Sequence, residues 1–349
     1  MNRTRLRMQS RAPRRQPTAK TLLGEVAEPD PGLRPQIARA LARARVGEDL
    51  PWLAVMAAVT VAEFLWWAVE WIVGAAPLPF VWTYLAVSIV GLVCALGLRG
   101  LLFRRWVAPN WPVVTAAVIM IGLGASLFLP IKYAIPRVVP FWLDQPLAGA
   151  ERSLFGADPW LLLDWLLGWA AVPIDWLYAT WLPTQSLVLF CVVLAPPSRE
   201  KTHALIAYVL GWFALGIVAA LALSSAGPLF DHRIFGGTDF AGLREVLHRR
   251  GAMLALAESD AMWASLESGR PTLVAGISAM PSIHVAISAW MALAAGVMAR
   301  RAAPWAIAYT ALIWIGSVQL GWHYFSDGLA GVLGIIAVWL FAGLVRRRT

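Results

Sequence analysis

Long apolar segments constrain the fold of this 349-residue chain more than any other feature. A transmembrane α-helix needs roughly 20 apolar residues to cross the hydrocarbon layer. With 59% hydrophobic and 14% charged residues, the chain also has the composition of an integral membrane protein. The sequence therefore predicts an all-α, polytopic membrane helix bundle of about eight transmembrane helices. We expect them at 52–75, 80–103, 112–130, 172–195, 203–224, 282–299, 303–321 and 325–345.

A further apolar segment, residues 156–170, is shorter and contains Asp164. Its length and its charge favour an interfacial or re-entrant helix over a full span. Cys94 and Cys191 lie far apart in separate apolar segments. We therefore expect free thiols rather than a disulfide or a thiolate metal site.

The net charge of +9 comes mostly from an N-terminal tail and from short loops between the apolar segments. Short cytoplasmic loops of membrane proteins are rich in Lys and Arg, so this pattern indicates orientation rather than a nucleic-acid partner. With the tail inside, every inner loop is basic: Arg99, Arg104 and Arg105; Arg199 and Lys201; Arg300 and Arg301; Arg346 to Arg348. We expect both termini to be cytoplasmic, in a bacterial-type plasma membrane.

The pattern divides the chain into three regions. Residues 1–50 form a basic, largely disordered cytoplasmic tail, in which 35–46 could be an amphipathic helix. Residues 51–110 supply two accessory transmembrane helices, and residues 111–349 supply a membrane core that carries all the polar anomalies. The core has two long outer loops, 131–171 and 225–281.

The polar residues that could do chemistry meet at the outer face in this topology. His284 begins one apolar helix, and His323 and Asp327 begin another, four residues apart and able to pair. A carboxylate that accepts the Nδ1 proton of a histidine leaves Nε2 as a nucleophile, and a second histidine can serve as general acid. Ser282, after Pro281 at a helix start, is suited to hold an anion with the free backbone amides.

Two short motifs resemble those of the type 2 phosphatidic acid phosphatase superfamily: "PSIH" at 281–284 and "HYFSDGLAG" at 323–331. Together with "AGPLFDHRIFGG" at 226–237, they look most like the inositolphosphotransferase, or inositol phosphorylceramide synthase, branch. The resemblance covers about 112–345 and implies a six-helix core. It also implies that His323 forms a phosphohistidine, that Asp327 orients it, that His284 protonates the departing oxygen, and that no metal or other cofactor takes part.

The chain departs from the superfamily in the first motif, whose lysine, arginine and proline string is absent. Lys132 and Arg137 in "IKYAIPRVVP" and Arg233 in the outer loop are candidate substrate phosphate-binding residues, and the alternative for each is a solvated loop charge. Asp144 and Glu151 are polar residues of a segment that also resembles the synthase branch. The outer loop 225–281 could cap the site and choose the acceptor.

These residues favour a metal-independent lipid phosphatase or phosphotransferase that acts on a lipid phosphate, with water or a lipid alcohol as acceptor. The residues do not separate hydrolase from transferase. An intramembrane serine protease using Ser278, in a loose G-x-S-x string, is one alternative. A transporter lined by polar residues is another, for which Glu63 and Glu70 in the first apolar helix are the main deep candidates.

Overall fold

The computed structural model describes residues 33–73, 80–102, 109–270, 272 and 276–348. The expected disordered tail at 1–32 lies outside the described residues. Residues 35–46 are helical, as part of α2 (Leu33–Ile72), and their amphipathic contact with lipid stays a prediction. The chain divides into two compact units, Met1–Ala44 and Arg45–Thr349, and all features discussed below belong to the second unit.

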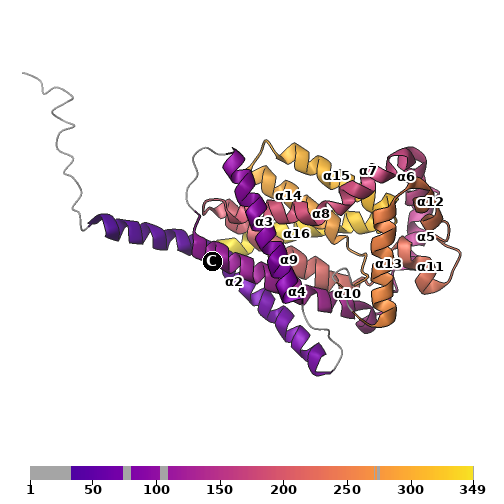
Figure 1. Ribbon diagram of the computed structural model, residues 1–349, viewed down its shortest axis with the longest axis horizontal. Helices are drawn as coiled ribbons and strands as arrows, with labels where there is room; N and C mark the ends of the chain where they lie inside the picture. The colour runs from indigo at the N-terminus through magenta and orange to yellow at the C-terminus, as the bar shows by residue number, and fades with distance from the viewer. Residues whose placement is uncertain (1–32, 74–79, 103–108, 271, 273–275, 349) are drawn as a thin grey trace, which may run out of the picture. The chain divides into compact units, whose positions relative to one another are not determined.

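All regular structure in the described part of the chain is helical (Figure 1), which confirms the all-α fold. In chain order α2 is followed by α3 (Val81–Leu102), α4 (Trp111–Val138), α5 (Asp144–Phe155), α6 (Pro159–Leu167), the 3₁₀ turn η1 (Gly168–Ala170), α7 (Ala171–Ala179), α8 (Trp181–Val193), α9 (Arg199–Phe213), the π-helical turn η2 (Ala214–Ala219), α10 (Ala220–Ala222), α11 (Pro228–Phe235), α12 (Leu243–Arg250), α13 (Met253–Ser268), α14 (Ile283–Met298), α15 (Ala303–Gln319) and α16 (Phe325–Arg348).

Within the described ranges, six helical segments are long and apolar enough to cross a membrane. They are Gly47–Ile72, Val81–Leu101, Trp111–Val138, Pro159–Ala179, Arg199–Ala222 and Phe325–Arg346. The polytopic bundle is therefore confirmed, with six rather than eight segments of full length. The expected span 172–195 is interrupted at Thr180, between α7 and α8, and α14 and α15 have only 16 and 17 residues.

The segment 156–170 is part of a longer helical run than expected, and its interfacial or re-entrant placement stays a prediction. Here α6 continues through η1 into α7, so the apolar run reaches 21 residues. The Asp164 carboxylate, which argued against a span, accepts hydrogen bonds of 2.9 and 3.0 Å from Arg250 of α12. Gly168 makes this approach possible, because a Cβ there would lie 2.6 Å from the Asp164 Oδ1 atom. The partner of Asp164 is 86 residues away, so the local pattern could not reveal it.

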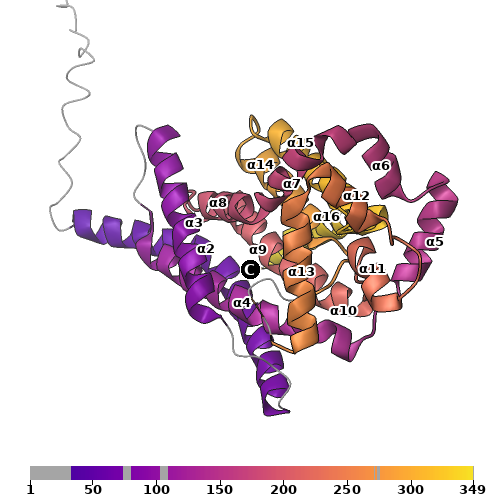
Figure 2. The same cartoon turned by 45° about the vertical axis from the view of Figure 1, so that its right-hand side comes forward.

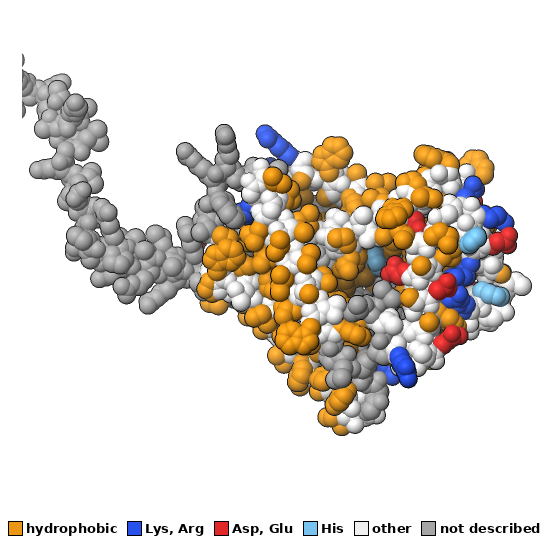
Figure 3. Space-filling model, viewed as in Figure 1, with side chains coloured by type: hydrophobic (Ala, Val, Ile, Leu, Met, Phe, Trp, Pro, Cys, Tyr) orange, Lys and Arg blue, Asp and Glu red, His pale blue; other side chains and the backbone are white. Residues whose placement is uncertain are grey.

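Charged side chains gather at one end of the molecule, around α5, α11 and α12, whereas hydrophobic side chains cover much of the remaining described surface in this view (Figure 3). Such a large exposed apolar surface is typical of contact with lipid. The charged end contains α5, from the predicted outer loop 131–171, and α11 and α12, from the predicted outer loop 225–281.

Helices α9, α14 and α16 pack against one another at the centre of the bundle (Figures 1 and 2). Glycines permit their close approach: a Cβ on Gly211 of α9 would lie 2.6 Å from Ile335, and one on Gly331 of α16 would lie 2.5 Å from the carbonyl oxygen of Ser282. Real Cβ atoms do not come this near to other heavy atoms. The start of α14 is thus pressed against the first turns of α16.

Candidate active site

His323 and Asp327 form the hydrogen-bonded pair expected from their spacing. The Asp327 Oδ2 atom lies 3.4 Å from the His323 Nδ1 atom and accepts a hydrogen bond of 3.0 Å from the backbone N–H of Tyr324. Asp327 is fully buried, and His323 is 5% exposed. The pair is not built on a regular helix, because α16 begins only at Phe325 and His323 lies in the turn before it. The N–H of His323 donates to the Ser317 carbonyl oxygen at 3.1 Å, which fixes this turn.

His284 lies in the first turn of α14 and faces the pair across the site. The centroids of the His284 and His323 rings are 5.8 Å apart. The His284 ring packs between two aromatic side chains, with Tyr178 stacked at 5.0 Å and Trp181 at 4.3 Å between centroids. The Trp181 indole N–H also donates to the His284 carbonyl oxygen at 2.9 Å. The ring therefore has little freedom to turn away from His323.

Ser282 caps α14. Its hydroxyl oxygen accepts from the N–H of Val285 at 3.4 Å, and its own N–H donates to the Asp327 carbonyl oxygen at 3.0 Å. A serine N-cap that satisfies an early helix amide is a common device. The side chain is fully buried and outside the lining of the adjoining cavity, so its contact with phosphate stays a prediction.

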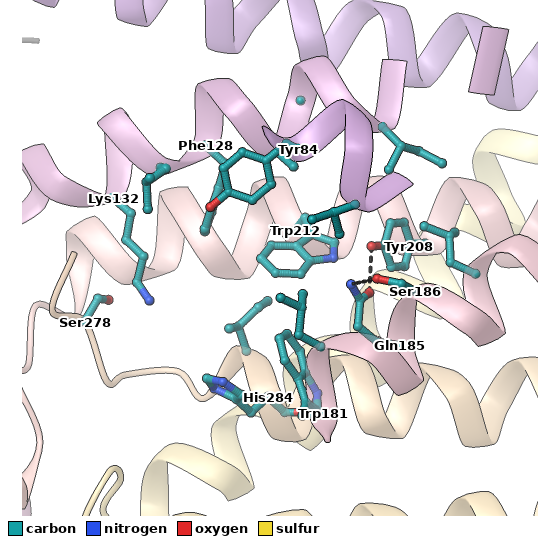
Figure 4. A pocket seen from close by; sticks show the side chains of 18 of the residues that line it. Tyr84, Phe128, Lys132, Trp181, Gln185, Ser186, Tyr208, Trp212, Ser278 and His284 are labelled. Carbon is teal, nitrogen blue, oxygen red and sulfur yellow. Dashed lines mark hydrogen bonds between the residues drawn. The ribbon is translucent and has the colours of Figure 1, made fainter. Parts of the chain in front are cut away.

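A cavity of about 330 Å³ adjoins the two histidines. Figure 4 shows the amino group of Lys132, the hydroxyl group of Ser278 and the ring of His284 around the same end of this cavity. Lys132 comes from α4, and its stem packs against Gly276, where a Cβ would lie 2.9 Å from Lys132 Cγ. Gly276 also has a φ of +97°, a conformation that favours glycine. A cation is thus held beside the histidine pair.

The other two basic candidates lie elsewhere. The Arg233 guanidinium pairs with Asp260 at 2.6 Å and lies over the Trp263 ring, and Arg137 lies 5.0 Å from the centroid of the Tyr133 ring. Neither arginine lines the cavity. Of the three predicted phosphate ligands, the structure brings only Lys132 to the histidines.

Two buried carboxylates of α5 hold the segments around the site, and the sequence did not assign them a role. Asp144 accepts hydrogen bonds from the N–H groups of Ala226 and Gly227 at 2.9 and 2.8 Å. Burial raises the pKa of Asp144, although these hydrogen bonds oppose the rise. Glu151 accepts from the N–H and the hydroxyl of Ser326 at 2.6 and 2.7 Å, at the start of α16. Both therefore act as positioning residues.

Sequence reasoning also missed the aromatic wall of the site and one acidic group in it. Tyr178, Trp181 and Trp322 line the cavity, as does Glu258 of α13. Aromatic side chains at helical spacing are common in any membrane helix, so no local signal marked these. In the part of the chain that the structure describes, no group of three or more His, Cys, Asp or Glu side chains is placed to hold a metal ion.

Comparison with known proteins gives one match. The family model described as the PAP2 superfamily matches residues 145–341, more than half of the chain. No curated protein and no solved structure matches the chain. The matched range contains His284, His323 and Asp327. It begins after α2, α3 and α4, and so excludes Lys132.

Proposed function

The chain belongs to the PAP2 superfamily, whose members are generally phosphatases or phosphotransferases, and from that premise we propose a membrane enzyme that cleaves a lipid phosphoester by way of a phosphohistidine. The observation that carries the proposal is the meeting of three groups. A histidine paired with a buried carboxylate stands 5.8 Å, ring to ring, from a second histidine. Family membership favours this chemistry over the protease and transporter alternatives.

In the first step, the His323 Nε2 lone pair attacks phosphorus, and the bond from phosphorus to the lipid oxygen breaks. The Asp327 carboxylate accepts a hydrogen bond from the Nδ1–H group of His323, which keeps Nε2 free to react and stabilises the positive charge that forms on the ring. His284 gives its proton to the departing oxygen, and the lipid leaves as an alcohol. Lys132 offsets the negative charge on the phosphoryl oxygens.

In the second step, an oxygen nucleophile attacks the phosphohistidine. His284, now neutral, removes the proton of water or of a lipid alcohol as that oxygen bonds to phosphorus. The bond from phosphorus to Nε2 breaks, and its electron pair returns to His323. Water gives free phosphate, and an alcohol gives a new phosphoester. The transferase outcome, with an inositolphosphotransferase-like headgroup transfer, is the finer form of the same proposal.

The proposed site faces the extracytoplasmic side, which is supported by the basic character of the loops on the other side. The charged end around α5, α11 and α12 fits the same orientation (Figure 3). The outer segment that includes α11, α12 and α13 supplies Glu258 and Met262 to the cavity and is the natural place for acceptor choice.

The test uses the purified protein in detergent micelles or proteoliposomes with labelled lipid phosphate, in the presence and absence of a lipid alcohol. We expect release or transfer of the label without added metal, and inhibition by vanadate, which mimics a phosphoryl transition state. His323→Ala should abolish both reactions, whereas Arg249→Ala, on the exposed face of α12, should retain them. Full activity of His323→Ala would refute the proposal.

A further inference from the structure

The cavity extends well beyond the histidines, between α2, α3 and α4, which the family match does not include, and α8 and α9, which it does. One stripe of α4 faces it at helical spacing: Ile121, Gly124, Ala125, Phe128, Leu129 and Lys132. Lys132 is the only charged member and stands at the catalytic end. At 1.5 Å per residue, the stripe continues about 16 Å from Lys132. A polar head and a long apolar extension therefore share one continuous space.

The accessory helices supply the outer wall of that extension. Met56, Thr60 and Glu63 of α2 line it, as do Tyr84, Val87 and Ser88 of α3. The cavity is much longer than a phosphate group needs, and most of its lining is apolar. This gives α2 and α3, which had no chemical role in the sequence, a place in the binding of the hydrophobic part of a lipid.

One group in this wall is anomalous. Glu63 is 5% exposed, lies within a membrane-spanning segment, and its Oε2 atom has no hydrogen-bond partner. An ionisable side chain inside a membrane protein is costly and usually has a functional partner. Glu63 lies opposite Gly124, where a Cβ would be 3.4 Å from Oε2 and 3.8 Å from the Thr60 hydroxyl. Gly124 is eight residues before Lys132, about 12 Å along α4.

The deep polar groups of α8 and α9 are different, because they satisfy one another. Tyr208 donates to Gln185 at 2.9 Å, and Gln185 donates to Ser186 at 3.2 Å. Figure 4 shows this group on the opposite side of the cavity from Lys132 and Ser278, with the Trp181 and Trp212 rings between. Among the described lining residues, Tyr178 and Glu63 each have a buried oxygen without a hydrogen-bond partner. Tyr178 stacks on His284 at the catalytic end, so Glu63 carries the inference for the apolar extension.

We propose that Glu63 is a specificity-determining residue, which binds a hydroxyl or amide group in the hydrophobic part of the lipid phosphate substrate. This inference rests on the proposed function. A carboxyl group accepts hydrogen bonds and, when protonated, also donates one, so it complements a hydroxyl or an amide. A plain hydrocarbon chain would leave the carboxyl unsatisfied, which is unfavourable in a buried site. The enzyme then selects a lipid with a polar group about 12 Å from its phosphate.

The test compares three substrates: hexadecyl phosphate, its mid-chain hydroxyl derivative, and p-nitrophenyl phosphate, which is too short to reach Glu63. Wild-type protein should have a lower KM for the hydroxylated chain, by roughly three- to tenfold, as expected for one hydrogen bond. Glu63→Leu should lose this preference, and Glu63→Gln should keep part of it. Glu70→Leu, which removes the same charge from the same helix outside the cavity lining, should behave as wild type.

Activity on p-nitrophenyl phosphate separates the proposed phosphatase function from the proposed role of Glu63. If wild-type protein cleaves none of the three phosphates, the proposed function fails. If it cleaves them without preferring the hydroxylated chain, or if a Glu63→Leu protein active on p-nitrophenyl phosphate keeps the preference, the role of Glu63 is refuted. Should Glu63→Leu fail to fold, Gly124→Leu tests the same space, and it should lose activity on the long chains while it retains activity on p-nitrophenyl phosphate.

Discussion

The backbone N–H of Ser282 donates a 3.0 Å hydrogen bond to the carbonyl oxygen of Asp327, which ties the start of α14 to the first turn of α16. His284 follows Ser282 by two residues, and Asp327 pairs with His323. This backbone contact therefore helps to fix the separation of the two histidines. Gly331 allows the contact by leaving room for the Ser282 carbonyl group.

Gly331→Ala should separate α14 from α16. The added Cβ would lie 2.5 Å from the Ser282 carbonyl oxygen, and neither backbone can yield without moving its helix. We expect a loss of roughly 1–3 kcal/mol in the free energy of unfolding, typical of overpacking, and a large loss of kcat. Activity assays and thermal unfolding in detergent measure both. Gly296→Ala is the control, because a Cβ at this position of α14 meets nothing within 4 Å. Wild-type activity and stability of Gly331→Ala would contradict the packing argument.

The three basic candidates should differ sharply on substitution by alanine. Lys132→Ala should lower kcat by about 10²-fold, because it removes a preorganised cation from the phosphoryl oxygens. Arg233→Ala and Arg137→Ala should each change kcat by less than about threefold, because neither arginine lines the cavity and partly exposed ion pairs and ring contacts contribute little. Steady-state kinetics of the three variants decides the matter. A larger effect at Arg233 than at Lys132 would reverse the assignment.

The sequence predicts those parts of the site whose signals lie within one short segment, and it misses those that depend on contacts between distant segments. The His323 and Asp327 pair and the position of His284 at a helix start follow from spacing and apolar pattern within short segments, and the structure brings the three together. The choice among Lys132, Arg137 and Arg233 could not be made that way. It depends on Gly276 packing on the Lys132 stem and on Asp260 holding Arg233, which are contacts between distant segments.

The same distinction applies to the fold. Apolar periodicity predicts the helices, but the partner of Asp164 in α6 is Arg250, a contact across 86 residues that no local pattern reveals. The buried carboxylates Asp144 and Glu151 are similar, since their partners lie in the loop before α11 and at the start of α16. A carboxylate that organises loops looks in sequence like any loop residue.

Asp231 should make stability depend on pH. Its pKa is raised to about 6, first by burial and then by the negative charges of Asp144 and Asp239. The folded protein therefore keeps a proton that the unfolded chain, with a pKa of about 3.9, has released, so stability falls as the pH rises from about 4 to about 6. Asn cannot release a proton in this range, so the stability of Asp231→Asn should not fall in this way. Melting temperatures of both proteins across this range should show the variant gaining on wild type as pH rises. A difference in melting temperature, variant minus wild type, that stays constant or falls as the pH rises would contradict the assignment.

The central claim is that His323 carries the phosphoryl group between donor and acceptor. The direct measurement is a rapid alkaline quench of the protein with phosphoryl-labelled lipid phosphate, followed by peptide mapping, because phosphohistidine survives base and is lost in acid. His284→Gln should slow both the formation and the breakdown of the labelled intermediate, because His284 acts in both steps. We predict an acid-labile label on His323, and none in His323→Ala. Turnover with no label on His323, or with the label on another residue, would contradict the account.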